Sequence, residues 1–346
     1  MENDSPIAES LVHFGRVAAW MDDQKLGAGP LGQIELLTGG TQNFLLRFER
    51  SGRRYVLRRP PEFKRANSDE TMRREARVLR ALAGTNVPHP GFIAGCDSFD
   101  VIGAAFYLME PVDGFNPSVG LPELFAHSAE TQYAMGIAMA DGISALGRVD
   151  HVAVGLGDFG KAAGWLERQV DRWWSHLESY ATFENYPGHG LAGIHDVASW
   201  LRERQPPQWT PGIIHGDFHF ANVMFQYDSP QLAAIVDWEL ATIGDPLLDL
   251  GHLLATWPVA GSPSAVASIA HLPPIDAVID QYANNTSRDM SQLNWYRVLA
   301  CYRLGIILEG TNARAWAGLA PRATGDQLHA TTVGLITQAH HLIAQR

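Results

Sequence analysis

Cysteine is scarce in this chain of 346 residues, which contains only Cys96 and Cys301. The two lie far apart in the sequence, and neither has another cysteine or a histidine at metal-ligand spacing. They can therefore form neither a disulfide framework nor a zinc knuckle. This scarcity indicates a reducing compartment.

Long apolar runs are also missing. No stretch approaches the roughly 18 apolar residues that a membrane-spanning helix needs. The acidic start of the chain leads into no apolar segment of the signal-peptide type. We therefore expect a cytoplasmic protein without membrane partners.

Basic residues are in short supply as well, because 26 Lys and Arg stand against 37 Asp and Glu, a formal charge of -11. Nucleic acids are bound mainly by basic side chains that neutralise phosphates, so a nucleic acid is not an expected partner. Residues 47–80 are the exception, with 12 basic and five acidic residues. This local surplus fits either a surface that binds an anion or an ordinary solvated face.

The first part of the chain has the pattern of a small antiparallel sheet. Arg50-Ser-Gly-Arg53 is typical of a hairpin turn between two strands. Asn67 followed by Glu70 predicts a helix start with a capping box. Apolar spacing predicts helices over 5–22 and 67–83, and strands over 33–37, 43–48, 54–58, 91–96 and 105–110.

From residue 121 onward the chain has mainly helical periodicity. We expect helices at about 121–147, 159–181, 192–204, 246–257, 275–285, 290–310 and 326–344. Residues 212–237 interrupt them with two apolar runs that flank a polar loop. The charge balance changes near residue 112, so the prediction is an α+β protein with an N-terminal β-rich lobe, residues 1–111, and a larger helical lobe, residues 112–346.

The polar loop holds the residues with the clearest chemical pattern, His215-Gly-Asp217-Phe-His-Phe-Ala-Asn222. Asp237 ends the apolar run that follows. Asn222 and Asp237 could bind one hard cation through oxygen atoms, which is the ligand type that Mg²⁺ prefers. Asp217 would then face an incoming hydroxyl group. The alternative is a polar turn with a capping aspartate.

Glu75 is placed by helical spacing on the apolar face of its helix, next to Met72, Leu79 and Leu82. An unpaired carboxylate would be costly there, so Glu75 needs a cationic partner.

These segments make the chain resemble the aminoglycoside phosphotransferase-like branch of the protein-kinase-like superfamily, above all the bacterial phosphotransferases related to a domain fused to acyl-CoA dehydrogenases. The resemblance runs from Leu37 to about Leu254. It rests on Leu37-Thr-Gly-Gly-Thr-Gln-Asn43, Tyr55-Val-Leu-Arg-Arg-Pro-Pro61, Arg74-Glu75, Phe106-Tyr-Leu-Met-Glu110, Ile214-His-Gly-Asp217 and Gly244-Asp-Pro-Leu-Leu-Asp-Leu250. It implies a two-lobed protein-kinase-like fold that binds ATP between a small antiparallel-sheet lobe with one helix and a larger, mainly helical lobe.

The resemblance also implies roles for the residues of the loop. Asp217 matches the catalytic base, and Asn222 and Asp237 match the Mg²⁺ ligands. His215 is expected to brace the loop rather than to transfer protons. His219 is outside the pattern and could contact the substrate.

Further matches concern the nucleotide. Arg58 stands where related folds carry a lysine that pairs with Glu75 and with the phosphates, and an arginine can also bind phosphate through its fork. Glu110 and Val112 match a hinge that reads adenine through a carbonyl and an N–H. Gly39, Gly40, Thr41 and Asn43 match a lid over the phosphates, a weak signal that an ordinary turn would also explain.

The resulting hypothesis is ATP- and Mg²⁺-dependent transfer of the γ-phosphate to a hydroxyl group of a small-molecule acceptor. A protein kinase is disfavoured because only eleven residues separate Asp237 from Asp249, too few for an activation segment. A non-catalytic, kinase-like nucleotide-binding protein is the alternative. The acceptor stays open between an aminoglycoside, a hydroxyacyl thioester and another alcohol, and the oligomeric state is open too.

Overall fold

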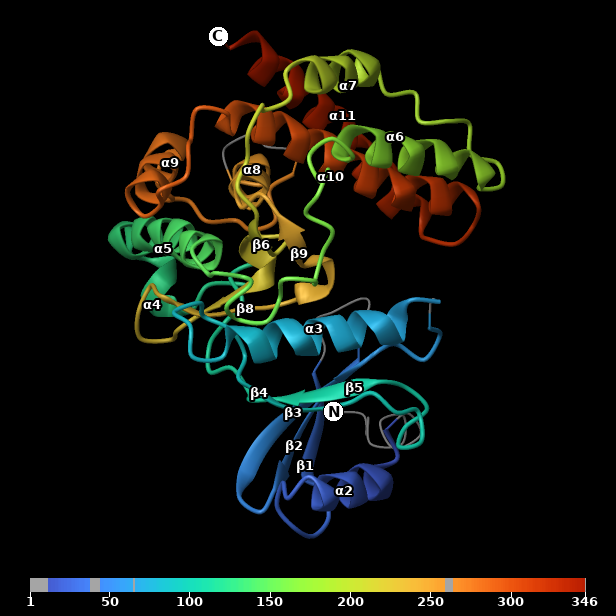
Figure 1. Ribbon diagram of the computed structural model, residues 1–346, viewed down its shortest axis with the longest axis vertical. Coiled ribbons are helices and arrows are strands. Elements are labelled where there is room, and N and C mark those ends of the chain that lie inside the picture. The colour runs from blue at the N-terminus through green and yellow to red at the C-terminus, as the bar shows by residue number, and fades with distance from the viewer. Residues whose placement is uncertain (1–11, 38–43, 65, 259–263, 346) are drawn as a thin grey trace. The chain divides into compact units, whose positions relative to one another are not determined.

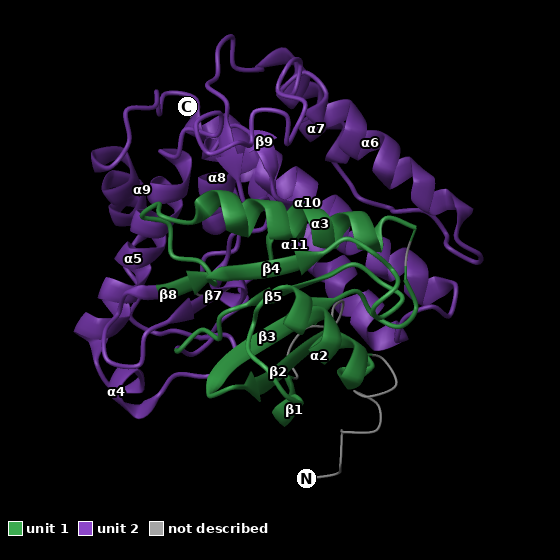
Figure 2. Ribbon diagram, turned by 60° about the horizontal axis from the view of Figure 1, so that its bottom comes forward, with its two compact units in different colours: residues 1–113, 233–239 green, residues 114–232, 240–346 purple. Residues whose placement is uncertain are grey.

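The computed structural model describes residues 12–37, 44–64, 66–258 and 264–345. These ranges form two compact units, which Figure 2 shows in different colours: unit 1 comprises residues 1–113 and 233–239, and unit 2 comprises residues 114–232 and 240–346. The start of the first predicted helix and the lid residues Gly39, Gly40, Thr41 and Asn43 lie outside the described residues.

Unit 1 contains an antiparallel sheet in the order β1-β2-β3-β5-β4. The strands are β1 (Gly32–Leu37), β2 (Phe44–Arg50), β3 (Arg53–Arg59), β4 (Phe92–Cys96) and β5 (Phe106–Met109). Ser51 and Gly52 connect β2 to β3, both with positive φ angles, 51° and 75°. This is the geometry of a tight hairpin turn, so the predicted hairpin is confirmed.

Two helices accompany the sheet. Helix α2 (Phe14–Asp23) contributes Val17 and Met21 to an apolar core with Leu46, Phe48 and Leu57 of the sheet. Burial of such side chains stabilises the fold by about 1.5–3 kcal/mol each.

Helix α3 (Ser68–Leu82) contacts β4 and β5. Figure 1 shows it lying along the sheet. The predicted capping box is wrong, because the Asn67 side chain makes no cap hydrogen bond. The first turn is instead tied to the sheet, since the backbone N–H of Ala105 donates to Asp69 Oδ1 at 2.9 Å.

Residues 233–239 belong to unit 1, whereas the predicted boundary near residue 112 places them in the second lobe. Strand β8 (Leu232–Ile235) brings the chain into this unit, and the N–H of Ile235 donates to the carbonyl of Pro88 at 2.9 Å. Long-range backbone pairing of this kind leaves no local pattern in the sequence.

Unit 2 is mainly helical. Its helices are α4 (Glu123–Ala126), α5 (Ala129–Gly147), α6 (Gln169–Ser179), α7 (Ile194–Glu203), α8 (Leu247–Ala255), α9 (Ile275–Asn284), α10 (Leu293–Trp316) and α11 (Arg322–Ala344). Helices α10 and α11 pack side by side (Figure 1). Strand β6 (Gly212–Ile214) pairs antiparallel with β9 (Thr242–Gly244), and β7 spans Val223–Phe225.

The predicted helices of this unit are present, but several ends differ. The first is divided because Ser128 caps a new helix, its hydroxyl oxygen accepting the N–H of Thr131. Residues 159–168 form bends and turns rather than a helix, so α6 begins ten residues later than predicted. In the described part of the chain, no helix has the length and apolar character needed to cross a membrane.

Candidate active site

The loop after β6 has a backbone that only glycine fits at its second position. Gly216 has a φ angle of 85°, and a Cβ atom there would lie 2.5 Å from the carbonyl oxygen of Leu240. The turn therefore directs the following residue, Asp217, away from the strand.

Asp249 of α8 fixes this loop through its backbone. Its carboxylate accepts the N–H of His215 at 2.6 Å and the N–H of Gly216 at 2.8 Å. Burial raises the pKa of Asp249 to about 7, against the opposing effect of these two hydrogen bonds. His215, fully buried, accepts the N–H of Asp217 on Nδ1 at 3.2 Å. Asp249 therefore ties α8 to the loop, and the contacts of His215 are those of a brace.

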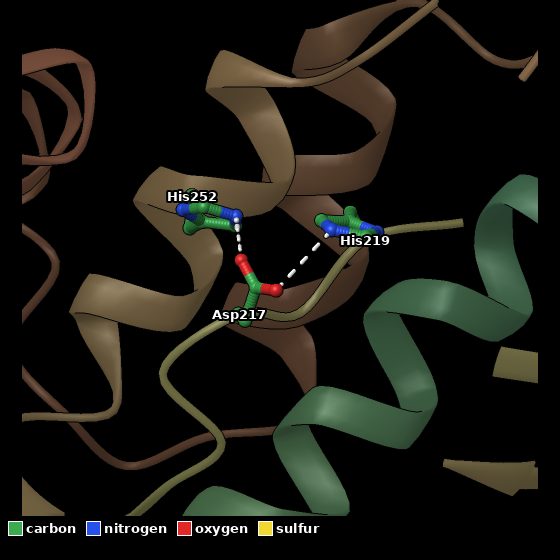
Figure 3. Close-up of side chains that lie close together, drawn as sticks. All are labelled: Asp217, His219 and His252. Carbon is green, nitrogen blue, oxygen red and sulfur yellow. Dashed lines mark ion pairs between the residues drawn. The ribbon is translucent and has the colours of Figure 1, made fainter. Parts of the chain in front are cut away.

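The Asp217 carboxylate lies between two imidazole rings (Figure 3). Nε2 of His252 is 3.1 Å from Oδ1, and Nε2 of His219 is 3.5 Å from Oδ2. The Asn222 amide donates to the backbone carbonyl of Asp217 at 2.9 Å and to Oδ2 at 3.0 Å. Burial acts to raise the pKa of Asp217, but the two histidines outweigh it and hold this pKa well below its usual range. The carboxylate is therefore ionised at neutral pH.

His252 is a residue that sequence reasoning missed. It lies in the apolar helix α8 and is fully buried. A single histidine within an apolar helical pattern gives no sign that it meets Asp217, 35 residues earlier.

The side-chain oxygen of Asn222 can serve as a ligand atom. Both hydrogen bonds that its side chain makes with the described residues use Nδ2, so its Oδ1 atom stays available to a cation. The residue lies at the end of a short 3₁₀ turn, Phe220–Asn222, which fixes its distance from Asp217.

Unit 1 carries a second charged cluster, around Arg58 of β3. Its Nε lies 2.9 Å from Glu75 Oε2, and its Nη2 lies 2.5 Å from Asp237 Oδ1. The Tyr107 hydroxyl donates to Glu75 Oε2 at 2.9 Å. The predicted pairing of Arg58 with Glu75 is thus confirmed.

The Glu75 side chain in this cluster is 1% exposed. Burial raises its pKa to about 7, while Arg58 and the Tyr107 hydroxyl act in the opposite direction. Arg58 is more strongly basic than usual, because Glu75, Tyr107 and Asp237 raise its pKa more than burial lowers it. The guanidinium is therefore the charge on which both carboxylates depend.

Asp237 also belongs to a group of carboxylates that could hold a metal ion. Ligand oxygens of Glu75, Asp237 and Glu239 lie within 4.8 Å of one another. Asp237 has a φ angle of 66°, in the left-handed region that is uncommon for residues other than glycine. An all-oxygen set of this kind suits Mg²⁺ better than a softer metal.

The predicted hinge residues follow β5. The N–H of Glu110 donates to the carbonyl of Gly91 at 2.8 Å, and its side chain pairs with Arg53 at 3.0 Å. The carbonyl of Glu110 and the N–H of Val112 have no hydrogen-bond partner among the described residues. Both groups are therefore free to meet a ligand.

The predicted site residues thus fall into two sets. His215, Asp217 and Asn222 come together in unit 2, and Arg58, Glu75 and Asp237 come together in unit 1. Asn222 and Asp237, the predicted ligands of one Mg²⁺, belong to different units, and their joint role stays a prediction.

Comparison with known proteins gives one family match and many relatives. A family model described as "phosphotransferase enzyme family" matches residues 33–280. The chain is 29% identical to acyl-CoA dehydrogenase family member 10 of Mus musculus over 315 residues, 87% of this chain and 28% of the relative. It is also 29% identical to probable acyl-CoA dehydrogenase IBR3 of Arabidopsis thaliana, over 80% of this chain and 35% of the relative. The chain therefore spans about a third of the length of these relatives.

Solved structures agree with the family match. A predicted aminoglycoside phosphotransferase of Ralstonia eutropha has 29% identity and a TM-score of 0.79, covering 94% of this chain and 98% of its own. The aminoglycoside phosphotransferase APH(4)-Ia, in complex with AMP-PNP and hygromycin B, has 16% identity and a TM-score of 0.63, covering 95% and 99%. These likenesses confirm the predicted two-lobed protein-kinase-like fold.

Proposed function

Because the chain belongs to the phosphotransferase enzyme family, we propose that it transfers the γ-phosphate of ATP to a hydroxyl group of a small-molecule acceptor. The observation that carries this proposal is the Asp217 carboxylate, ionised and held by His252, His219 and Asn222 in a loop that Asp249 fixes. A base of this kind has no use in a protein that only binds a nucleotide.

Asp217 accepts the proton of the acceptor hydroxyl as the hydroxyl oxygen forms a bond to the γ-phosphorus of ATP, and the bond from that phosphorus to the β,γ-bridging oxygen breaks to release ADP. The transferring phosphoryl group needs little covalent help, so catalysis depends mainly on positioning and on neutralisation of negative charge. The hydrogen bonds from Asn222 and the contact with His252 orient the carboxylate. His215 and Asp249 hold the backbone beneath it.

Mg²⁺ fits the donor set of these residues, since Asn222 offers its amide oxygen and Asp237 a carboxylate beside Glu239. A bound Mg²⁺ would neutralise the charge that develops on the phosphate oxygens. Arg58, oriented by Glu75, would bind phosphate oxygens through the same fork that now contacts Asp237.

The remaining nucleotide contacts are proposed by the same reasoning. The carbonyl of Glu110 and the N–H of Val112 would read the adenine edge, and Gly39, Gly40, Thr41 and Asn43 would cover the phosphates. Nucleotide binding is supported by related folds that were solved with AMP-PNP and with GDP. A cytoplasmic location is supported by Cys96 and Cys301, which are both free.

The test is the variant Asp217→Asn, with Asp171→Asn as the matched control, because Asp171 is 72% exposed and pairs with Arg202 on the surface of the same unit. We expect D217N to lower ADP release from Mg-ATP, measured with a panel of alcohols, by roughly 10²–10⁴-fold, the usual contribution of a general base. Its nucleotide affinity, measured by thermal shift with Mg²⁺, should match that of the wild type and of D171N.

Two outcomes would oppose the proposal. A wild-type protein that binds no nucleotide in the presence of Mg²⁺ would contradict it altogether. The second outcome is that the wild type and D217N bind Mg-ATP equally well, that no acceptor of the panel stimulates ADP release, and that D217N does not change the rate of ADP release. This outcome would favour the non-catalytic, kinase-like nucleotide-binding protein.

A further inference from the structure

Arg303, in the middle of α10, is a buried cation without an oxygen partner. The residue is 5% exposed, and its Nη1 atom is fully buried and has no hydrogen-bond partner. Its guanidinium makes no hydrogen bond or ion pair with any residue in the described ranges. Its neighbour is an aromatic ring, that of Trp173 on α6, with 5.2 Å between Cζ and the ring centroid.

The other buried arginines of the described chain each have at least one oxygen partner. Arg50 donates to Asp22, Arg58 pairs with Glu75, and Arg59 donates to the carbonyl of Pro60. Taking a guanidinium out of water costs several kcal/mol unless oxygen acceptors replace the lost water. Among the buried arginines that the structure describes, Arg303 is the only one for which the protein supplies no such oxygen.

Trp173 adds a second donor at the same place. Its indole Nε1 is buried and has no hydrogen-bond partner. Arg172 lies over the same ring, with 5.3 Å between Cζ and the centroid. One indole therefore contacts two guanidinium groups, and the cluster of Arg172, Trp173 and Arg303 has donors but no acceptor.

The two carboxylates that act electrostatically on Arg303 do not fill this need. Burial lowers the pKa of Arg303, whereas Asp217 and Asp249 act in the opposite direction, so both lie within electrostatic range of the guanidinium. Asp249 already accepts two backbone N–H groups. Asp217 already contacts His252, His219 and Asn222.

We propose that Arg303, together with the Trp173 indole N–H, binds an anionic group of the acceptor, a carboxylate or a phosphate, while the acceptor's hydroxyl group faces Asp217. The inference rests on the proposed function and names the substrate class that the site would take. A guanidinium binds either anion through two parallel hydrogen bonds. A cationic acceptor would be repelled by Arg303 and Arg172.

The experiment compares four sets of alcohols of matched chain length: hydroxyalkanoic acids, their primary amides, hydroxyalkyl phosphates and amino alcohols. Binding is measured by isothermal titration calorimetry with Mg²⁺ and a non-hydrolysable ATP analogue, and ADP release gives kcat and KM. Hydrogen bonds to a charged group are worth about 1.5–3 kcal/mol, so the acid or the phosphate should bind roughly 10- to 100-fold more tightly than the amide. The comparison of acids with phosphates identifies which anion is used.

Arg303→Gln should reduce the preference for the anion over the amide to about none, chiefly through Kd and KM. Arg303→Lys keeps the charge without the fork and should retain part of the preference. Trp173→Phe keeps an aromatic ring but removes the N–H donor, which gives an independent test if R303Q does not fold. Arg202→Gln, which removes an exposed guanidinium from the same unit, is the control and should keep the full preference.

Three results would overturn the inference. The first is no binding of any acid or phosphate, and the second is binding of the amides or amino alcohols that equals or exceeds that of the acids. The third is an equal loss of acid and amide binding in R303Q, which a purely structural role of Arg303 would give. If nucleotide binding and turnover of a neutral or cationic alcohol persist in any of these cases, the proposed phosphotransfer stands. Absence of nucleotide binding would instead contradict the proposed function itself.

Discussion

Replacement of Arg58 by alanine tests the buried charge cluster of unit 1. In R58A, the Glu75 carboxylate keeps only the Tyr107 hydroxyl, at 2.9 Å, in a position where its side chain is 1% exposed. Removing one partner of a buried ion pair costs about 3–5 kcal/mol, because the other group stays buried without its partner, either as a charge or after taking up a proton. The Asp237 side chain is 38% exposed, so its lost pair costs at most about 1 kcal/mol. We therefore expect R58A to lower the free energy of unfolding by about 4 kcal/mol.

Urea unfolding followed by circular dichroism measures this loss. With a slope of roughly 3 kcal/mol per M, the unfolding midpoint of R58A should fall by about 1 M or more. The double variant R58A/E75A should recover most of the stability, because removing both partners leaves no buried charge unpaired. Arg47→Ala is the control, since Arg47 pairs with Glu35 on the exposed surface of the same unit and should cost less than about 1 kcal/mol.

The reasoning would be refuted in two ways. One is a loss in R58A no larger than that in Arg47→Ala. The other is a double variant that is no more stable than R58A, because the cost would then come from lost packing rather than from the buried Glu75 charge.

Three further predictions concern nucleotide affinity, pH and thiol reactivity. R58A should bind Mg-ATP more weakly in calorimetric titrations, and an unchanged Kd would exclude Arg58 from the phosphate site. Burial raises the pKa of Asp217 and the two histidines lower it, so His252→Gln should raise this pKa and shift the acidic limb of the kcat–pH profile to higher pH than in the wild type. Identical pH profiles would contradict the role of His252. Burial raises the pKa of the Cys96 thiol and raises that of the Cys301 thiol to about 12. Neither thiol should therefore react with a chromogenic disulfide at about pH 8 until urea unfolds the protein. Rapid labelling of the native protein would contradict this prediction.

The secondary structure of this chain was largely predictable because its signals are local. The Ser51-Gly52 turn has the positive φ angles that its composition predicts. Helix α3 places Glu75 on its buried face, as the spacing of Met72 and Leu79 predicts. Helix ends were less predictable, since the division at Ser128 depends on one hydroxyl that caps a new helix.

Parts of the candidate site had no local signal. His252 and Arg303 are polar residues in helices whose other positions are largely buried and apolar. A helical pattern shows that such a residue is buried, but not which group it meets. The placement of residues 233–239 in unit 1 also has no local signal, because it depends on a backbone hydrogen bond to Pro88 and on the ion pair with Arg58.

The sequence by itself determined the elements, the glycine that the Asp217 loop requires and the chemical groups available for phosphate transfer, because turns, periodicity and motif spacing act over a few residues. Only the tertiary structure decided which charges share a neighbourhood. It joins Arg58 to Asp237 across 179 positions, sets His252 beside Asp217, and leaves Arg303 without an acceptor. The free energy of a buried charge depends on the groups within a few ångströms of it, and only the folded chain specifies those groups.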